Sequence, residues 1–360
     1  MIVTGRSRSA WSRRASRGRS LFLAGLLALT TLILSACGEE RVAAIGDADD
    51  ILVGVEPILA RQIQRRTSAA LAPPLFAIPN ARTFQVTYQD PTAEEWPSLR
   101  QNRQVLLIGK PEDPWIVDAL AQADEAPDSV PAAPALFELE DVWAADQRVT
   151  VLLVPESNPS RAVLDKLDSL STSYERRYRE GVVARMFADG PNQPLSDSLD
   201  ATGFNILVPK DYEWTTEGDV YLFRKIGSDS GASVRHVTVT WRTPIPQGMQ
   251  GEGLLAWRRQ LATDHYGTTQ RTNLNNVQAT QTTHRGNVTY QLLGMWSRTA
   301  SGRTERGPFI LRAEICTAQD RMYLLDAWLY APNQDQHEHM VELESILNSF
   351  RCGSGRAMAQ

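Results

Sequence analysis

Two short polar runs contain residue types that could carry out catalysis or bind a metal. Gly227-Ser228-Asp229-Ser230-Gly231 has glycines at the spacing of a nucleophile elbow, but Asp229 occupies the place of the serine. His337-Glu338-His339 places two imidazoles at i and i+2, which project about 200° apart on a helix and cannot chelate one ion there. We expect a polar hairpin loop for the first run and a solvated first helical turn for the second. The sequence therefore predicts no catalytic residues, no metal ligands and no cofactor.

A hairpin expected at 309–317 and 322–331 could gather charged and aromatic side chains on one face. If its loop keeps the alternation of the two strands in step, their apolar side chains share one face. The opposite face then carries Arg312, Glu314, Asp326 and Trp328. This group could bind a ligand or a partner, or it could form a cross-strand ladder of ion pairs. It contains no nucleophile with an adjacent base, so we assign it no reaction.

Cys37 has the most specific chemistry in the chain. It ends the run Leu34-Ser35-Ala36-Cys37, which follows an Arg-rich stretch and the apolar run from Leu21 to Leu34. This apolar run is shorter than the about 20 residues that span a membrane. The segment resembles the lipobox of bacterial lipoproteins, in which the cysteine thiol is joined to diacylglycerol. We expect 1–36 to be a lipoprotein signal peptide, 37–49 a polar tether, and Cys37 the lipid anchor.

The anchor predicts a place in the cell envelope and a set of partners. Gly38 stands where an Asp would favour retention in the inner membrane, so we expect the periplasmic face of the outer membrane. Residues 1–36 hold six Arg and no acid, and the rest of the chain carries 31 basic against 42 acidic side chains. This acidic balance argues against nucleic acid as a partner. The expected partners are the membrane, through Cys37, and an envelope protein.

Cys316 and Cys352 are the two cysteines that remain after lipidation. In an oxidising compartment, a pair in one domain is more often bridged than free. A bridge would pin the closing helix to the sheet and stabilise the fold by about 4 kcal/mol in the chain-entropy model. Strand parity opposes it, since Cys316 should share the face of Arg312 and Glu314 rather than the face that the helix covers. We nevertheless predict a Cys316–Cys352 disulfide.

Two sequence patterns divide the mature chain. The first half repeats a strand, a turn and a helix, with apolar strands expected at 50–55, 104–109 and 148–154. The second half is dominated by alternating runs such as 234–242, and ends in a helix with Met340, Leu343 and Phe350 on one face. We expect an α+β fold with two domains, 50–190 and 200–352. Each should be a mainly antiparallel or mixed sheet packed with helices.

Several runs resemble a family of bacterial lipoproteins, the domain of unknown function numbered 4837. They are Leu136 to Ala144, Ile206-Leu207-Val208-Pro209, Gly307-Pro308-Phe309, Asp326 to Pro332 and Leu343 to Phe350. The resemblance covers most of the mature chain. It implies a fold, and it does not indicate an activity. The second half also resembles, more loosely, the PsbP and Mog1 type of fold, whose members are mostly binding or assembly factors. Fold alone does not carry a function across.

These observations favour a membrane-anchored, non-catalytic binding or assembly module. One alternative is an envelope hydrolase whose site is assembled from distant residues. Another is a carrier of a small amphipathic ligand, which the eight Trp after Cys37 suggest. A deep apolar pocket would favour the carrier, converging acids with perturbed pKa would favour the enzyme, and a broad exposed patch would favour a protein partner.

Overall fold

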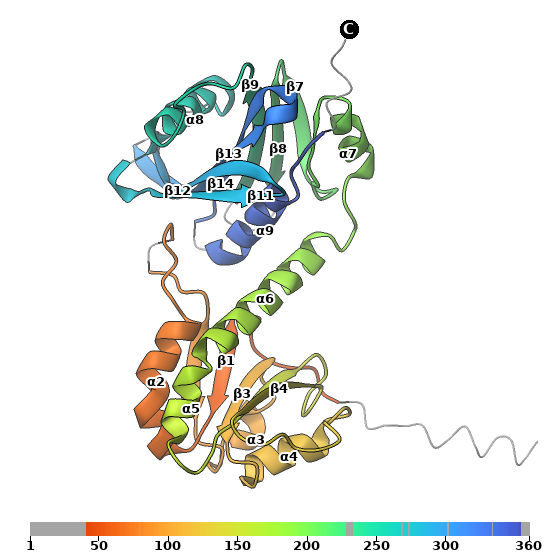
Figure 1. The fold of residues 1–360 in the computed structure, drawn as a ribbon, viewed down its shortest axis with the longest axis vertical. Coiled ribbons are helices and arrows are strands. Elements are labelled where there is room, and N and C mark those ends of the chain that lie inside the picture. Colours follow the sequence, from red (N-terminus) through yellow and green to blue (C-terminus); the bar gives the residue numbers. More distant parts are fainter. Residues whose placement is uncertain are drawn as a thin grey trace, which may run out of the picture.

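The computed structural model describes residues 41–353, apart from Pro79, 228–232, Thr268, Asn273, Ser301 and Asn333. Within these residues the chain forms two lobes, one around each of its two larger sheets (Figure 1). Cys37, the expected signal peptide and most of the Gly227 to Gly231 loop lie outside the described residues. Among the described helices, none combines the length and the apolar character needed to cross a membrane.

The first lobe is built on a mixed sheet of five strands in the order β2-β1-β3-β5-β4. β1, β2, β3 and β5 are parallel neighbours, and β4 joins the edge in the antiparallel direction. The central strands are buried on both faces, which explains why they read as continuous apolar runs. Their bounds are β1 Asp50–Gly54, β2 Gln85–Gln89, β3 Gln104–Gly109, β4 Ala135–Glu140 and β5 Arg148–Leu153.

Helices cover both faces of this first sheet. One face packs against the long helices α2 (Pro57–Leu71) and α6 (Leu167–Met186) with the shorter α5 (Pro159–Asp165). The other packs against α3 (Trp96–Leu99) and α4 (Pro114–Gln122). α2 lies between the parallel strands β1 and β2, and α3 lies between β2 and β3, because a chain must cross over to begin the next parallel strand.

The second lobe is built on an antiparallel sheet of eight strands. Its order is β10-β12-β13-β14-β9-β8-β7, and β11 also pairs with β12. The bounds are β7 Glu213–Glu217, β8 Val220–Ile226, β9 Val234–Arg242, β10 Arg271–Thr272, β11 Gln278–His284, β12 Asn287–Ala300, β13 Arg303–Cys316 and β14 Arg321–Tyr330. The α+β class and the mixed and antiparallel sheets that the sequence predicts are therefore confirmed.

The two faces of this second sheet carry different helices. We call the face that packs against α8 (Glu252–His265) the α8 face. We call the opposite face, which packs against α9 (Gln336–Asn348) and α7 (Gln193–Asp200), the α9 face. Two short strands, β6 (Phe204–Asn205) and β15 (Arg351–Cys352), pair beside α7 and close the end of the chain onto this lobe.

The helices α6 and α9 join the two lobes. The ring of Tyr178 on α6 stacks on the ring of His337 on α9, with centroids 4.9 Å apart. Arg179 pairs with Glu344 at 2.5 Å, and Val341 of α9 packs into the core of the first lobe. The solvated turn expected at His337 is therefore wrong for this residue, which is buried because α6 covers it.

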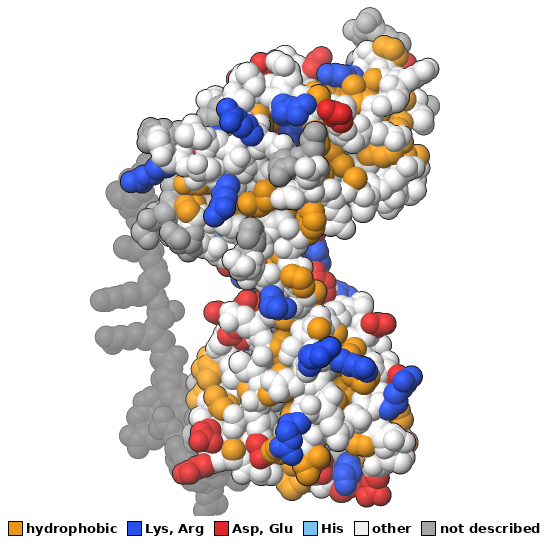
Figure 2. Space-filling model, turned by 90° about the vertical axis from the view of Figure 1, so that its left-hand side faces the viewer, with side chains coloured by type: hydrophobic (Ala, Val, Ile, Leu, Met, Phe, Trp, Pro, Cys, Tyr) orange, Lys and Arg blue, Asp and Glu red, His pale blue; other side chains and the backbone are white. Residues whose placement is uncertain are grey.

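The surface carries mixed side chains. In the view of Figure 2, basic, acidic and hydrophobic side chains are interspersed over both lobes. The large exposed hydrophobic side chains among the described residues belong to separate elements, for example Ile58 on α2, Val117 on α4 and Trp214 on β7. Scattered exposed hydrophobic residues of this kind need no partner to explain them.

Candidate ligand-binding site

The register of the β13–β14 hairpin separates the four residues that the sequence groups together. Asp326 lies opposite Leu311, and Arg312 lies opposite Leu325. Four residues connect Cys316 to Arg321, so odd positions of one strand pair with even positions of the other. The expected common face is therefore corrected: one pair of the four residues lies on the α9 face, and the other pair lies on the α8 face.

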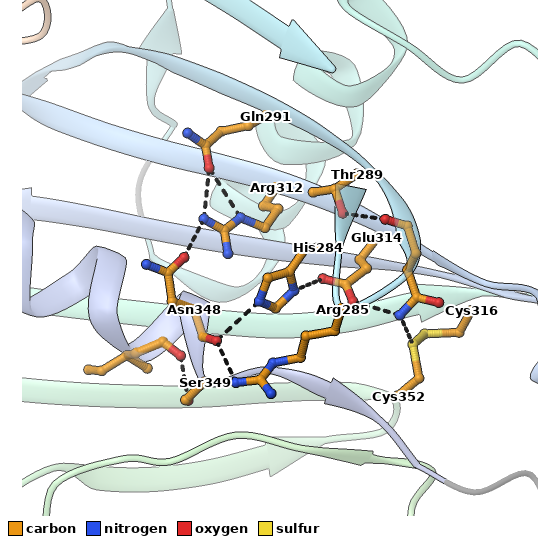
Figure 3. Close-up of polar contacts among 12 residues, drawn as sticks. His284, Arg285, Thr289, Gln291, Arg312, Glu314, Cys316, Asn348, Ser349 and Cys352 are labelled. Carbon is orange, nitrogen blue, oxygen red and sulfur yellow. Dashed lines mark hydrogen bonds and ion pairs between the residues drawn. A yellow bond between two sulfur atoms is a disulfide. The ribbon is translucent and has the colours of Figure 1, made fainter. Parts of the chain in front are cut away.

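Arg312 and Glu314 lie on the α9 face within a polar network (Figure 3). Arg312 donates to Gln291 Oε1 at 2.8 Å and to Asn348 Oδ1 at 2.9 Å. Desolvation lowers the pKa of this buried guanidinium, although nearby carboxylates oppose the shift. These contacts tie the middle of the sheet to the end of α9. Nε and Nη2 of the guanidinium are engaged in this way, and Nη1 is buried without a hydrogen-bond partner among the described residues.

Glu314 is fully buried and joins the network to the disulfide. It accepts from Asn287 Nδ2 at 3.0 Å and lies 2.9 Å from His284 Nδ1. Asn287 Nδ2 also lies 3.2 Å from Cys352 Sγ. The predicted Cys316–Cys352 disulfide is confirmed. Its apparent parity problem disappears because the face of Arg312 and Glu314 is the face that α9 covers.

Asp326 lies on the α8 face and forms a fully buried ion pair with Arg258 of α8. Arg258 Nε donates to Asp326 Oδ1 at 2.8 Å, and Nη2 donates to Gln270 Oε1 at 2.7 Å. The Tyr266 hydroxyl, at the end of α8, donates to Asp326 Oδ2 at 2.9 Å. Burial raises the pKa of Asp326, and the Arg258 guanidinium opposes that shift. These residues form a second polar cluster, separate from the network of Arg312 and Glu314 on the α9 face.

Trp328 lies beside this pair and contacts His236. The two residues are register partners on β14 and β9, with ring centroids 5.0 Å apart. Burial, together with the Arg224 and Arg258 charges, lowers the pKa of His236 to about 3. His236 is therefore neutral near pH 7. Among the described residues, His236 Nδ1, Trp328 Nε1 and Arg258 Nη1 are buried polar atoms without a hydrogen-bond partner.

A cavity of about 350 Å³ opens beside these residues on the α8 face. Its size is at the lower end of the range of small-molecule pockets. We call it the aromatic pocket and define it by the rings that line it. They are Trp214, His236, Tyr266, Trp296, Trp328 and Tyr330.

Gly307 allows one of these rings to reach its place. A Cβ at Gly307 would overlap Leu329 O and would come within 3.1 Å of Trp296 Nε1. Without that Cβ, the indole of Trp296 passes over β13 and donates to Leu329 O at 3.1 Å. Trp296 thereby reaches Trp328, with ring centroids 5.4 Å apart.

Charged side chains of both signs also line the aromatic pocket. Glu213 and Glu217 come from β7, and Arg224 and Arg298 come from β8 and β12. Glu217 pairs with His265 at 2.6 Å, which joins β7 to the end of α8. The described lining contains carboxylates and imidazoles but no serine or cysteine nucleophile. In the described part of the chain, no cluster of three or more His, Cys, Asp or Glu could hold a metal ion.

Sequence reasoning misses Arg258, although the sequence carries a signal for it. Leu254, Leu255, Leu261 and Ala262 mark the apolar stripe of α8, and Arg258 falls within that stripe. A charge at such a position must find a buried partner. Asp326, a charge within the apolar run of β14, is that partner. His236, Tyr266 and Trp296 have no comparable signal, because aromatic residues at these spacings are equally typical of an ordinary core.

Comparisons with known proteins bear on the second lobe. Residues 192–349 match the family "Domain of unknown function (DUF4837)". The match is narrower than the resemblance over most of the mature chain that we expected, since the run from Leu136 to Ala144 lies outside it. At the sequence level, no curated protein matches the chain.

Solved structures similar to this chain include the Ran-binding protein Mog1p of Saccharomyces cerevisiae. That match has 11% identity and a TM-score of 0.31, and covers 44% of this chain and 94% of Mog1p. LpqN of Mycobacterium tuberculosis, involved in cell envelope biogenesis, matches at 13% identity and a TM-score of 0.23, covering 41% of this chain and 78% of LpqN. The sequence led us to expect the Mog1 likeness. At these TM-scores neither likeness bears on function.

The matched range contains α7, the whole eight-stranded sheet and α9, and so it contains both polar clusters and the aromatic pocket. Residues 192–349, the part of this chain that matches the DUF4837 family, are therefore the part that holds the candidate site.

Proposed function

We propose that this chain is a lipid-anchored protein of the cell envelope whose second lobe binds a small ligand in the aromatic pocket. The observation that carries the binding proposal is a pair of buried polar atoms in the pocket wall, His236 Nδ1 and Trp328 Nε1, that have no hydrogen-bond partner among the described residues. A buried donor or acceptor without a partner costs about 1–3 kcal/mol. A ligand that supplies the missing hydrogen bonds recovers that free energy on binding.

The contrast with Arg312 and Glu314 supports this choice of site. Side chains from β11, β12 and α9 engage both residues, and the pocket does not include them. A ligand at the α9 face would have to displace contacts that hold α9 and the disulfide. At the aromatic pocket it would displace solvent.

Native mass spectrometry of the mature chain, mixed with aqueous and organic extracts of bacterial envelopes, tests the binding proposal. We expect a small-molecule adduct on the wild-type chain that a Trp328→Ala variant loses. Arg312→Met is the matched control, since it removes a polar side chain from the opposite face, and it should keep the adduct. No adduct from either extract, or an adduct that Trp328→Ala retains, would show that the pocket is not a binding site.

The anchoring proposal rests on the run Leu34-Ser35-Ala36-Cys37 after an Arg-rich and apolar leader. Two or three acyl chains on Cys37 would hold the two lobes at a membrane surface. We propose the periplasmic face of the outer membrane, because Gly38 follows the cysteine.

Metabolic labelling with a fatty-acid analogue tests the anchor. The wild-type chain should be labelled and should fractionate with outer membranes, and Cys37→Ala should be unlabelled and accumulate as precursor. Ser35→Thr keeps the cysteine and serves as a processing control. Label on the Cys37→Ala chain would contradict the assignment of the anchor.

A further inference from the structure

We propose that the ligand of the aromatic pocket is a neutral saccharide unit of one or two rings, an inference that rests on the proposed function. The cavity of about 350 Å³ is of the size that such a unit fills. The arrangement of the rings, the balance of charge in the lining and the buried polar atoms each favour this chemistry.

Several neighbouring rings of the aromatic pocket meet edge to face rather than in parallel stacks. His236 and Trp296 both meet Trp328 edge to face, at interplanar angles of 78° and 76°. His236 meets Tyr266 at 80°. A planar base sandwiched between two of these rings would need them parallel, whereas the ring pairs that contact one another in this pocket meet at angles from 45° to 80°. A sugar ring is puckered and presents C–H groups on one face, so it can pack against one ring while others enclose its edge.

The charges of the lining favour a neutral ligand. Glu213 on β7 lies opposite Arg224 on β8, and Arg224 lies opposite His236 on β9. His236 in turn lies opposite Trp328, so one row of side chains crosses four strands on the same face of the sheet. An anionic ligand over this row would meet Glu213, and a cationic ligand would meet Arg224.

The side chains of this row require a ligand that both donates and accepts hydrogen bonds. The Glu213 carboxylate only accepts, whereas the Arg224 guanidinium and the Trp328 indole only donate. Neutral His236 can do either, depending on its tautomer. A hydroxyl group donates and accepts at one atom, and a saccharide carries several hydroxyl groups around its ring. Its chemistry therefore matches this row more closely than that of an amine, a carboxylate or an acyl chain.

An acyl chain fits the lining poorly. Glu213, Arg224 and Arg298 contribute charged groups to the wall, and an acyl chain would remove their water without replacing its hydrogen bonds. Since the lining contains both charged side chains and rings, a ligand with one apolar face and a polar edge satisfies both. The anchor on Cys37 would supply a setting in which envelope glycans are present.

Titration of the full mature chain with N-acetylglucosamine, its β-1,4-linked dimer and maltose tests the proposal, with adenosine and lauric acid as the competing chemistries. Tryptophan fluorescence reports binding, because three indoles line the cavity. We expect saturable binding of at least one saccharide, and roughly tenfold or greater weakening in Trp328→Ala. Arg312→Met should bind as the wild type does.

A second variant protects the test against a failure of Trp328→Ala to fold. Glu213→Gln alters an exposed residue at the mouth of the pocket, so it should leave the fold intact while weakening saccharide binding roughly severalfold to tenfold. If Glu213→Gln and Trp328→Ala both bind saccharide as tightly as the wild type, the saccharide does not occupy this pocket.

The identity of the adduct from envelope extracts separates the two proposals. An adduct that contains hexose or hexosamine and is displaced by the free sugar supports the saccharide assignment. An adduct that contains a nucleobase or only an acyl chain, lost in Trp328→Ala, overturns the saccharide while the pocket remains a binding site. The absence of any adduct overturns both.

Discussion

The α8 and α9 faces of the second sheet each bury charged side chains, but they use them differently. On the α9 face, Arg312 and Glu314 contact side chains from β11, β12 and α9. On the α8 face, His236 Nδ1 and Trp328 Nε1 lack a partner among the described residues and belong to the wall of the aromatic pocket, whereas Arg312 Nη1, which also lacks a partner, does not. Polar groups that hydrogen-bond to one another stabilise a fold. Polar groups without partners beside a cavity can bind a ligand without first breaking hydrogen bonds within the protein.

Residues with these two roles lie close together in the sheet. Arg312 lies opposite Leu325 of β14 on the α9 face, and the next residue of β14, Asp326, points to the α8 face. The neighbours that each face meets, rather than the type of charge, decide whether a polar residue builds the fold or the site. Variants on each face test that difference.

Arg258→Met should have the largest effect, because it leaves the fully buried Asp326 carboxylate without its ion-pair partner. We expect the free energy of unfolding in urea to fall by about 3–5 kcal/mol. The neighbouring Arg259→Met, at a partly exposed position of the same helix, is the control and should change it by less than about 0.5 kcal/mol. Adding Asp326→Leu to Arg258→Met should restore most of the loss. A loss equal to that of Arg259→Met would mean that the pair contributes nothing.

Reduction of the Cys316–Cys352 disulfide tests the covalent support of the α9 face. The two cysteines are 36 residues apart in sequence, so opening the bridge should lower the free energy of unfolding by about 4 kcal/mol in the chain-entropy model. Urea denaturation with and without reductant measures this, and titration of free thiols verifies the reduction. If the reduced chain is as stable as the oxidised one, the network around Glu314 holds α9 without the bridge.

Acidification should act through His236 on the α8 face. Burial and the charges of Arg224 on β8 and Arg258 on α8 lower its pKa from 6.5 to about 3. Between these values the unfolded chain binds the extra proton, so stability is present above about pH 6.5 and is lost as the pH falls towards 3. Trp328 and Tyr266 also face the ring and carry no charge near pH 7.

Comparison with His236→Gln isolates this contribution from other titrating groups. From pH 6.5 to pH 4.5, the wild type should lose roughly 2–3 kcal/mol more than the variant, since one pKa unit corresponds to about 1.36 kcal/mol. Unfolding free energies at the two pH values provide the measurement. Equal losses in the two proteins would place the acid sensitivity elsewhere.

Glu217→Gln should have the smallest effect on stability. Glu217 pairs with His265 at the mouth of the aromatic pocket, and its side chain is 56% exposed. Exposed pairs contribute about 0–1 kcal/mol because water screens them. Thermal unfolding should therefore shift only slightly. A loss comparable to that of Arg258→Met would show that the mouth of the pocket is as tightly coupled to the fold as its buried side.

The sequence predicts strands well where burial imposes a pattern. The expected strand at 104–109 and the alternating run at 234–242 coincide with β3 and β9. By contrast, the sequence does not predict β7 and β11, because nearly all their residues are exposed and they show no apolar alternation. These two strands exist because β8 and β12 offer them hydrogen-bonding partners.

The candidate site was harder to predict for a related reason. The sequence places Asp326 and Trp328 among residues of interest, but their grouping with Arg312 and Glu314 depends on the number of residues between paired strand ends. That number depends on the short helical turn at Thr317–Gln319, which sequence alternation does not reveal. The aromatic pocket depends further on α8 and on Gly307, both of which reach it from other parts of the chain.

The stacking of Tyr178 on His337 bears on the order in which the chain can fold. Chains are synthesised from the N-terminus, and domains generally fold as they emerge. Yet the core of the first lobe contains Val341, and the Tyr178 ring remains uncovered until α9 has been made. The core of the first lobe therefore lacks its α9 contacts until the entire eight-stranded sheet has been synthesised. A nascent chain that ends before Gln336 should accordingly show a first lobe that proteases open more readily than in the finished protein.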